Sequence, residues 1–383
     1  MSSYHPSHEL PQPSSEQMAH SIQLIDKIIQ HIEAAGGVIS FRDYMQHCLY
    51  EPGLGYYTAG STKFGAAGDF VTAPEISSLF GQCIANQAQE LFEQGLKREI
   101  LEFGAGTGKL CADMIQRFNT EGVQWTAYHI LEPSADLQQR QQVYLEQQLN
   151  AEDYAKIHWL YELPQGFNGL MLGNEVLDAM PVNVVVKEQQ WVELGVGFVE
   201  QKFQWLEYAK DSAAVKAIQA IDQDDHLPLH YCTEINLNYA PWCQGVMQSC
   251  DQAVLLLIDY GYAREQYYHV ARHSGTLMCF YQHRSHPDPL IFPGLQDITA
   301  FVDFDAFADA ALASGFDLMG MSTQASFLIN NGLLDLVSAH AQDEAAQLAL
   351  SQQIKTLTLP GEMGDKFKVV GLQSGTHFTM RGL

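Results

Sequence analysis

The sequence predicts an α/β fold built on an open, seven-stranded, mostly parallel sheet, with a helical region before the sheet and a β-rich lid inserted into it. Residues 100–110 read as a short apolar strand, a glycine-rich turn and the start of a helix, an arrangement that brings backbone close to a nucleotide-like ligand. A second strand pattern at residues 125–131 follows roughly thirty residues on, the spacing of one βαβ unit. Residues 182–208 then change to β-type alternation. Such an interruption after a fourth strand predicts an inserted lid.

The region before the glycine turn, residues 1–95, is predicted to contain a tail and a set of helices. Residues 1–17 are rich in Ser, Pro, His and Gln and are expected to form a flexible tail. Apolar residues at helical spacing and Ser or Thr residues at capping positions define the helices that follow. We expect helices at residues 20–35, at 41–48 with Ser40 as its cap, and at 76–94 with Thr72 as its cap.

The core, residues 96–383, is predicted to alternate strands and helices around the lid at about 182–250. A buried apolar run at 169–173 forms the fourth strand and delivers Asn174 and Glu175 at its carboxyl end, where parallel sheets bind their ligands. The other expected elements are strands at 156–160, 253–258, 316–321 and 367–372, the last antiparallel, and helices at 213–221, 304–314 and 333–355.

Three known patterns compete for the glycine turn. The dinucleotide fingerprint G-x-G-x-x-G fails because Lys109 follows Gly108, so the third glycine comes one position early. The phosphate loop G-x-x-x-x-G-K-[ST] fails because Phe103 and Leu110 stand where its first Gly and its Ser/Thr belong. The remaining pattern is an acid, Glu102, just before G-x-G-x-G. It resembles motif I of class I S-adenosylmethionine (SAM) methyltransferases.

A second acid favours SAM over a dinucleotide. Glu132 follows the second strand and can accept hydrogen bonds from both ribose hydroxyls. Acids on either side of the turn can attract the cationic sulfonium of an adenosine ligand. The negative charge of Glu102 would instead repel a pyrophosphate. The predicted cofactor is therefore SAM, and the predicted binding residues are Glu102, Gly104, Ala105, Gly106, Glu132 and Asn174.

The composition restricts the class of partner. Apolar residues make up 46% of the 383 residues, as in globular proteins. Lys+Arg 20 against Asp+Glu 45 give a net charge of −25, which repels nucleic acid and attracts a basic peptide or a cation. We find no apolar run as long as a membrane span, no signal or transit peptide pattern, and no C-x-x-C among the seven cysteines. We therefore expect a cytoplasmic (bacterial) protein with reduced thiols, and the loosely spaced histidines predict no metal site.

Several longer segments carry a more specific resemblance than the glycine turn. The most distinctive is 64–77, which reads F-G-x-x-G-D-F-x-T-x-P-E-I-S. The others are E-P-x-x-G-Y-Y at 51–57, N-E-V-L-D-A-x-P-V at 174–182, D-Y-G at 259–261, H-R-x-H at 283–286, P-G-x-x-D-I-T-A-x-V-D at 293–303 and G-E-M-G at 361–364. From about residue 20 to its C-terminus, the chain resembles the MidA/NDUFAF-seven-type (DUF185) methyltransferases, which include the mitochondrial complex I assembly factor and its bacterial relatives.

This resemblance implies a class I SAM-dependent methyltransferase with a Rossmann-like core. The family's mitochondrial member is associated with symmetric dimethylation of an arginine in a complex I subunit. The expected partner is thus a protein acceptor with an exposed arginine, such as a respiratory complex subunit, and a homodimer is a further expectation. Two alternatives remain: a small-molecule O- or N-methyltransferase, and a SAM-binding assembly chaperone without turnover. Both would bind SAM with the same part of the protein.

The candidate catalytic residues are three acids. Glu175 lies at a strand tip, and Asp178 follows three residues later, so both would face the same way on a helical turn. Asp259 ends the fifth strand. Carboxylates can hold a protonated guanidinium bidentately. For Asp178, capping or pairing with a surface lysine stays open as an alternative. The candidate residues of the loop expected to close over the site are Asp69, Phe70, Thr72 and Glu75.

Overall fold

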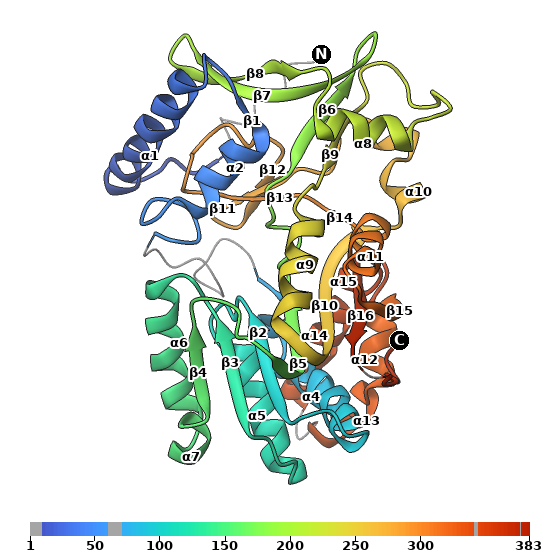
Figure 1. Cartoon of the computed structure of the whole chain (residues 1–383). Coiled ribbons are helices and arrows are strands. Elements are labelled where there is room, and N and C mark those ends of the chain that lie inside the picture. The colour runs from blue at the N-terminus through green and yellow to red at the C-terminus, as the bar shows by residue number, and fades with distance from the viewer. Residues whose placement is uncertain (1–9, 60–70, 341–343, 376) are drawn as a thin grey trace. The chain divides into compact units, whose positions relative to one another are not determined.

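The chain divides into two units, each made of three stretches of sequence (Figure 1). The computed structural model describes residues 10–59, 71–340, 344–375 and 377–383. The unit that we call the sheet unit consists of Val71–Leu177, Tyr239–Tyr262 and Val302–Leu383. The second unit consists of Met1–Phe70, Asp178–Asn238 and Ala263–Phe301.

The sheet unit alternates strands and helices along most of its length, as the sequence predicts. Its elements are α3 (Ala73–Ile76), α4 (Ser78–Glu93), β2 (Glu99–Phe103), α5 (Lys109–Glu121), β3 (Ala127–Leu131), α6 (Ala135–Gln148), α7 (Ala151–Tyr154), β4 (Ile157–Leu160), β5 (Phe167–Asn174), α9 (Tyr239–Ser249), β10 (Cys250–Tyr262), β14 (Val302–Asp303), α11 (Phe304–Ala313), β15 (Asp317–Thr323), α12 (Gln324–Asn330), α13 (Leu333–His340), α14 (Glu344–Thr358), α15 (Met363–Lys366) and β16 (Phe367–Ser374).

The strands of this unit form one open sheet in the order β15-β16-β10-β5-β2-β3-β4, with β14 paired to β10. Neighbours from β10 to β4 are parallel, and β16 is antiparallel to both β10 and β15. The predicted mostly parallel sheet and its antiparallel last strand are therefore confirmed. Within the described residues the sheet holds eight strands instead of seven, because the two-residue β14 adds a short parallel pairing at the end of β10.

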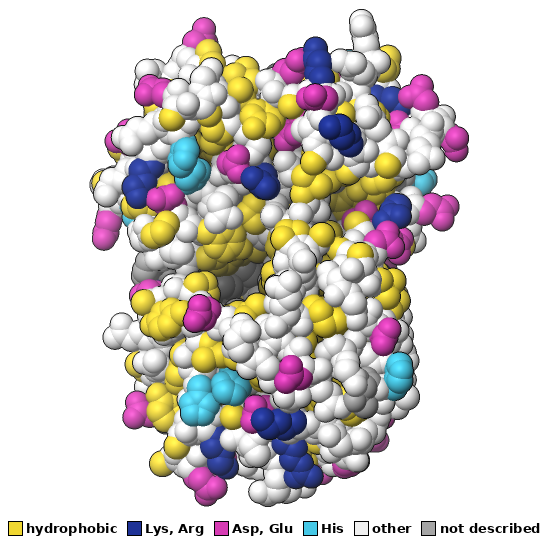
Figure 2. Space-filling model, in the orientation of Figure 1, with side chains coloured by type: hydrophobic (Ala, Val, Ile, Leu, Met, Phe, Trp, Pro, Cys, Tyr) yellow, Lys and Arg dark blue, Asp and Glu magenta, His cyan; other side chains and the backbone are white. Residues whose placement is uncertain are grey.

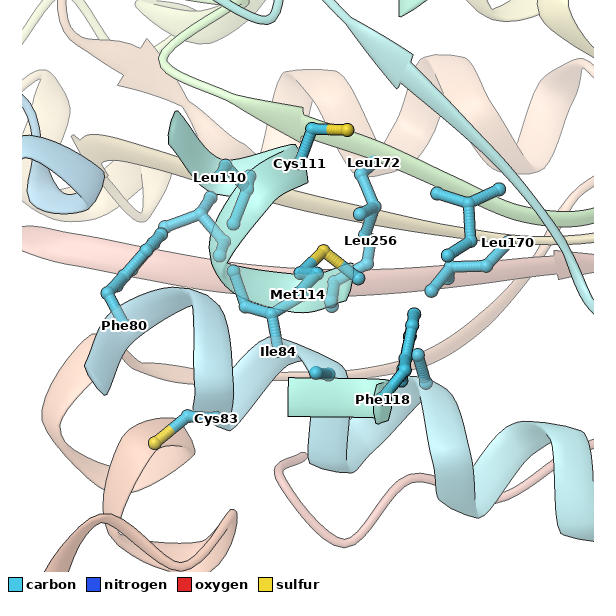
Figure 3. Close-up of a cluster of buried hydrophobic side chains, with 14 of the residues drawn as sticks. Phe80, Cys83, Ile84, Leu110, Cys111, Met114, Phe118, Leu170, Leu172 and Leu256 are labelled. Carbon is cyan, nitrogen blue, oxygen red and sulfur yellow. The ribbon is translucent and has the colours of Figure 1, made fainter. Parts of the chain in front are cut away.

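Helices pack on both faces of this sheet, which explains why its central strands are apolar throughout. In Figure 3, side chains of α4 and α5 lie in one buried cluster with Leu170, Leu172 and Leu256 from β5 and β10. On the other face, the ring of Trp242 in α9 lies 5.3 Å from the ring of Phe103 in β2. The glycine turn after β2 therefore emerges from a strand that is held on both sides.

The second unit is a mixture of helices and antiparallel strands. Its elements are α1 (Ser15–Ala34), β1 (Ile39–Ser40), α2 (Phe41–Tyr50), β6 (Asn183–Lys187), β7 (Trp191–Val199), β8 (Lys202–Ala209), α8 (Ala213–Ile221), β9 (Cys232–Ile235), α10 (Arg264–Tyr267), the 3-10 helix Val270–Arg272, β11 (Met278–Tyr281), β12 (Arg284–His286) and β13 (Asp297–Thr299). The strands form a five-stranded sheet, β1-β7-β6-β9 with β8 on β7, and a three-stranded sheet, β12-β11-β13. Leu24 and Ile28 of α1 and Phe41 of α2 share a core with Val184 and Val196 of the larger sheet.

This division differs from the boundaries expected from the sequence, which placed a helical region at 1–95 and a lid at about 182–250. β1 pairs with β7, so α1 and α2 share a core with the inserted strands. α3 and α4 belong to the sheet unit, where α4 packs on α5. The insertion ends at Asn238, before α9, and Ala263–Phe301 joins the same unit. Long-range strand pairing and core packing set these boundaries, and neither appears as a change in composition.

Capping explains one further difference, because the helix expected at 76–94 is split at Ser77. Ser77 is extended, with φ −156° and ψ 137°, and its hydroxyl accepts a hydrogen bond from the backbone N–H of Leu79. It therefore ends α3 and caps α4. Thr72 occupies the N-cap position of α3, but its side chain makes no capping hydrogen bond. The predicted cap of α2 is confirmed, because Ser40 Oγ accepts from Asp43 N at 3.1 Å.

Charged side chains are spread over the surface. Figure 2 shows acidic and basic side chains scattered over the visible face without gathering in a single patch. No helix within the described ranges is long and apolar enough to cross a membrane.

The close crossing of α4 and α5 gives a stability prediction. A Cβ atom at Gly81 would lie 2.7 Å from Asp113 Cβ, so Gly81→Ala should push the two helices apart and destabilise the protein by about 1–3 kcal/mol. Gly245 in α9 has nothing within 4 Å of its Cβ position, and Gly245→Ala should stabilise by about 0.4–1 kcal/mol. Urea unfolding of both variants measures the difference. Equal effects of the two substitutions would contradict the crossing geometry.

Candidate functional site

The glycine turn after β2 is open to a ligand at two positions. Gly104, Gly106 and Gly108 have φ values of 60°, 55° and 87°, in the left-handed region that favours glycine. A Cβ atom at Gly104 or Gly106 would meet nothing within 4 Å, whereas one at Gly108 would lie 3.3 Å from Leu145 Cγ. Gly108 therefore allows close packing, and the first two leave room beside the backbone. Ala105, also a predicted cofactor residue, is buried in this turn.

Glu75 lies directly against this turn. Thr107 Oγ1 donates a hydrogen bond of 2.5 Å to Glu75 Oε1, so the segment around α3 is tied to the glycine turn. The sequence assigned Glu75 and Thr72 to a loop over the substrate, and both lie in the sheet unit. The other two candidates from that loop, Asp69 and Phe70, lie outside the described residues.

Glu102 is buried in the sheet unit, with 3% of its surface exposed. Its Oε2 accepts a hydrogen bond of 2.7 Å from the hydroxyl of Tyr128, which also lies 3.9 Å from Met114 Sδ of α5. Burial raises the pKa of Glu102 to about 7, and the nearby Glu132 carboxylate adds to the shift although the Tyr128 hydrogen bond opposes it. Glu102 therefore faces the α5 side of the sheet. Contact with the cofactor stays a prediction, and the sequence did not indicate Tyr128 as its partner.

Glu132, directly after β3, has a carboxylate fixed by two donors. Oε1 accepts from Ser134 N at 3.0 Å, and Oε2 accepts from Gln141 Nε2 at 3.2 Å. The same Gln141 nitrogen donates to Gly106 O at 3.0 Å. Glu132 is thus brought beside the glycine turn, as expected for an acid that binds a ribose. Sequence reasoning missed Gln141, which lies in a glutamine-rich helix where no spacing sets it apart.

The end of β5 brings together Asn174 and Glu175. Asn174 Nδ2 donates to Glu175 Oε1 at 3.3 Å, and the backbone N–H of Glu175 donates to Ile258 O at 2.8 Å. Asn174 Oδ1 is buried and has no hydrogen-bond partner among the residues that the structure describes. Glu175 has φ 54°, a left-handed conformation that is uncommon for a residue other than glycine. A strained acid and a buried amide oxygen therefore share the carboxyl end of this strand.

The catalytic role expected for Asp259 stays a prediction, and the structure shows which backbone groups its carboxylate binds. Asp259 is fully buried, and its Oδ2 accepts from the backbone N–H groups of Val176 and Leu177 at 3.1 and 2.8 Å. Its Oδ1 accepts from Tyr260 N at 2.9 Å. Because three backbone amides engage its two oxygens, Asp259 acts on the bend after Glu175. These hydrogen bonds give Asp259 a positioning role at this bend.

The expected pairing of Glu175 with Asp178 on a helical turn is wrong. The backbone from Glu175 to Asp178 forms bends and the start of a turn, and no helix begins there. Asp178 also belongs to the second unit, whereas Glu175 belongs to the sheet unit. Asp178 is buried, and its backbone oxygen accepts from Ala300 N at 3.0 Å. The pKa of Tyr57 is raised chiefly by burial, with smaller contributions from carboxylates that include Asp178.

The described ranges contain no set of three or more His, Cys, Asp or Glu side chains that could hold a metal ion.

The raised pKa of Glu102 predicts a dependence of stability on pH. The folded protein, with a pKa of about 7, binds more protons than the unfolded chain, with a pKa of 4.5. The contribution of Glu102 to stability therefore falls as the pH rises from about 4.5 to about 7. Glu102→Gln keeps an acceptor for Tyr128 and does not titrate. We expect the difference in free energy of unfolding, variant minus wild type, to be about 2–3 kcal/mol larger at pH 8 than at pH 5, because only wild type loses the contribution of Glu102. Urea unfolding at both pH values tests this, and a constant difference would refute it.

The turn itself gives a binding prediction. Gly106→Val places a branched side chain in the open space beside the turn and should weaken binding of S-adenosyl-homocysteine at least about tenfold while the fold survives. Gly122 at the C-cap of α5 is the matched control, because its φ of 67° and its open Cβ position impose the same backbone strain. Calorimetry should find normal affinity for Gly122→Val. Normal affinity for Gly106→Val would remove the turn from the site.

Comparisons with known proteins agree on one family. The family model described as "Putative S-adenosyl-L-methionine-dependent methyltransferase" matches residues 80–322. The mitochondrial protein arginine methyltransferase NDUFAF7 of Danio rerio is 28% identical in an alignment 391 positions long, which covers 92% of this chain and 88% of the relative. The Homo sapiens protein of the same name is 27% identical over 374 residues, covering 88% and 80%. A Burkholderia thailandensis "likely methyl transferase", solved bound to S-adenosyl-homocysteine, is 37% identical with a TM-score of 0.91 over 97% of both chains.

The geometry fits the methyl donor that this family uses. Gly104 and Gly106 leave open space beside the turn, Glu132 supplies a fixed carboxylate next to it, and Asn174 offers a buried amide oxygen. The family model covers residues 80–322, well over half of the chain, and the resemblance seen in the sequence motifs is confirmed. The chain belongs to the family of S-adenosyl-L-methionine-dependent methyltransferases, and SAM is its cofactor.

Proposed function

We propose that this methyltransferase acts on an arginine side chain of a protein acceptor. The observation that carries the proposal is the carboxylate of Glu175, which lies at the carboxyl end of a central parallel strand on a strained backbone. The names of the relatives in Danio rerio and Homo sapiens, protein arginine methyltransferases, support the same acceptor. A net charge of −25 is compatible with a basic partner.

The chemistry of the acceptor explains why a carboxylate is needed. A bound SAM supplies an electrophilic methyl group on a sulfonium. The guanidinium of arginine is protonated at any working pH, and a carboxylate can accept two of its N–H groups. Held in this way by Glu175, the positive charge is favoured on the nitrogens that do not attack. The attacking nitrogen forms a bond to the methyl carbon as the carbon–sulfur bond breaks, and it releases one proton, so the product guanidinium keeps a single charge.

Hydrogen bonds from neighbouring residues fix the backbone that carries the Glu175 side chain. Asp259 takes the backbone N–H groups of Val176 and Leu177, and Glu175 N donates to Ile258 O. These hydrogen bonds fix the bend on which the Glu175 side chain stands. A carboxylate that is already oriented loses little conformational freedom when it binds a guanidinium.

The proposal extends to the setting of the reaction. We infer a cytoplasmic enzyme of a bacterial cell that acts on an exposed arginine of a respiratory complex subunit, with a homodimer as its assembly. The motif resemblance, which runs from about residue 20 to the C-terminus, supports the acceptor, and the seven cysteines without a C-x-x-C support the reducing compartment. Size-exclusion chromatography with light scattering tests the assembly independently of the acceptor.

Labelled SAM separates the candidate functions. The purified protein is incubated with methyl-labelled SAM and lysate from cells that lack it, and the products are separated by size and read by mass spectrometry. Label on a protein arginine supports the proposal. Label on a small molecule points to an O- or N-methyltransferase. Bound SAM without transfer to either fraction points to an assembly chaperone, and both of these results overturn the proposal.

Two substitutions of Glu175 test the carboxylate directly. Glu175→Gln keeps the shape but loses the charge, so methyl transfer to arginine should fall about tenfold to a hundredfold while SAM affinity changes little. Glu175→Gly should lose activity as strongly and also raise the stability of the fold, because glycine accepts a φ of 54°. Asp178→Asn in the second unit is the charge-matched control, with a smaller loss expected. Normal turnover by Glu175→Gln would contradict the proposal that the Glu175 carboxylate holds the guanidinium.

A further inference from the structure

A continuous chain of hydrogen bonds links three elements of the sheet unit through one side chain, Gln141 of α6. Trp159 Nε1 in β4 donates to Gln141 Oε1 at 3.0 Å. Gln141 Nε2 donates to Gly106 O in the glycine turn at 3.0 Å and to Glu132 Oε2 after β3 at 3.2 Å. We call these four groups the Gln141 bridge. It joins the two parts of the site expected to hold SAM.

The chemistry of the partners fixes the orientation of the Gln141 amide. The indole N–H of Trp159 can only donate, so the amide oxygen must face it. Both hydrogens of the amide nitrogen then point to acceptors, the Gly106 carbonyl and the Glu132 carboxylate. A flipped amide would place a donor against the Trp159 donor and an acceptor against two acceptors. Trp159 thus determines how Gln141 meets the site.

Burial makes this bridge rigid. Gln141 has 0% of its surface exposed, so water does not compete for its hydrogen bonds. Gly106 has no side chain to restrain its backbone, and Gln141 holds its carbonyl. Glu132 Oε1 is held separately by Ser134 N.

We propose that Gln141 is a positioning residue for cofactor binding. It sets the separation between the glycine turn and the Glu132 carboxylate before SAM arrives, and Trp159 sets the direction of its amide. The competing view is that Gln141 only packs α6 against the sheet. The positioning role and the packing role predict different effects of a substitution at Gln141. Positioning affects cofactor affinity through Glu132, whereas packing affects stability alone.

Gln138 provides a matched control on the same helix. It is buried, and its Nε2 donates to the backbone oxygen of Glu132 at 2.6 Å, but no hydrogen bond joins it to the Glu132 carboxylate or the turn. Gln141→Met and Gln138→Met each remove one buried amide of similar size. We expect comparable losses in thermal stability from the two. Only Gln141→Met should weaken S-adenosyl-homocysteine binding about tenfold or more, measured by calorimetry on the full chain.

A double-mutant cycle tests the link to Glu132. On a Glu132→Gln background, Gln141→Met should weaken binding far less than it does in wild type, because the charged partner of Gln141 is already gone. Full additivity of the two substitutions would overturn the proposal. So would equal losses of affinity from Gln141→Met and Gln138→Met.

A charge substitution gives a second readout if Gln141→Met fails to fold. Gln141→Glu still accepts from Trp159 but faces the Glu132 carboxylate, and two carboxylates this close share a proton. Affinity for S-adenosyl-homocysteine should therefore fall as the pH rises from about 5.5 to 8, and it should do so more steeply than in wild type. Gln141→Glu with the pH profile of wild type would leave only the packing role.

Discussion

The carboxyl edge of a parallel sheet leaves backbone N–H groups that no neighbouring strand can accept, and the rest of the site depends on how these groups are satisfied. Asp259 accepts three of them, from Val176, Leu177 and Tyr260. Glu132 accepts one from Ser134. These carboxylates take the place of strand partners and thereby fix the paths of the loops that follow β3 and β5. The loops carry the residues that can meet a cofactor or an acceptor.

Position alone therefore does not tell what a strand-tip acid does. Four acids lie at or just beyond the ends of parallel strands, and their surroundings differ. Glu102 accepts from a tyrosine in a buried environment that raises its pKa to about 7, whereas Asp259 is surrounded by backbone amides. The Glu132 carboxylate accepts hydrogen bonds from a backbone amide and from a glutamine side chain. Glu175 itself adopts a left-handed backbone conformation. The sequence predicts that acids will lie at this edge because apolar runs end there. It cannot predict the roles of Glu102 and Asp259, because these depend on donors such as Tyr128 and Val176, which lie 26 and 83 residues away in the chain.

The same reasoning explains which parts of the fold the sequence could predict. The strands of the sheet unit and the glycine turn are local patterns of apolar runs and glycines, and they lie close to where the sequence places them. The unit boundaries depend on pairings such as β1 with β7, which joins Ile39 to Val196. The predicted alignment of Glu175 and Asp178 assumed a helix, and the positive φ of Glu175 excludes it. Gln141 was missed because a buried glutamine and an exposed one look alike in a polar helix.

The backbone at Glu175 raises the question of why glycine does not occupy that position. A left-handed conformation costs a residue such as Glu about 1–3 kcal/mol. Each hydrogen bond to a charged acceptor contributes about 1.5–3 kcal/mol, so the two that Asp259 accepts from Val176 and Leu177 are of the size needed to offset the strain. Glycine would fit the bend with less strain, and what it would remove is the carboxylate. A side chain kept at a position where its own backbone is unfavourable is best explained by what it binds, and this strain supports the proposal that Glu175 holds a cationic acceptor.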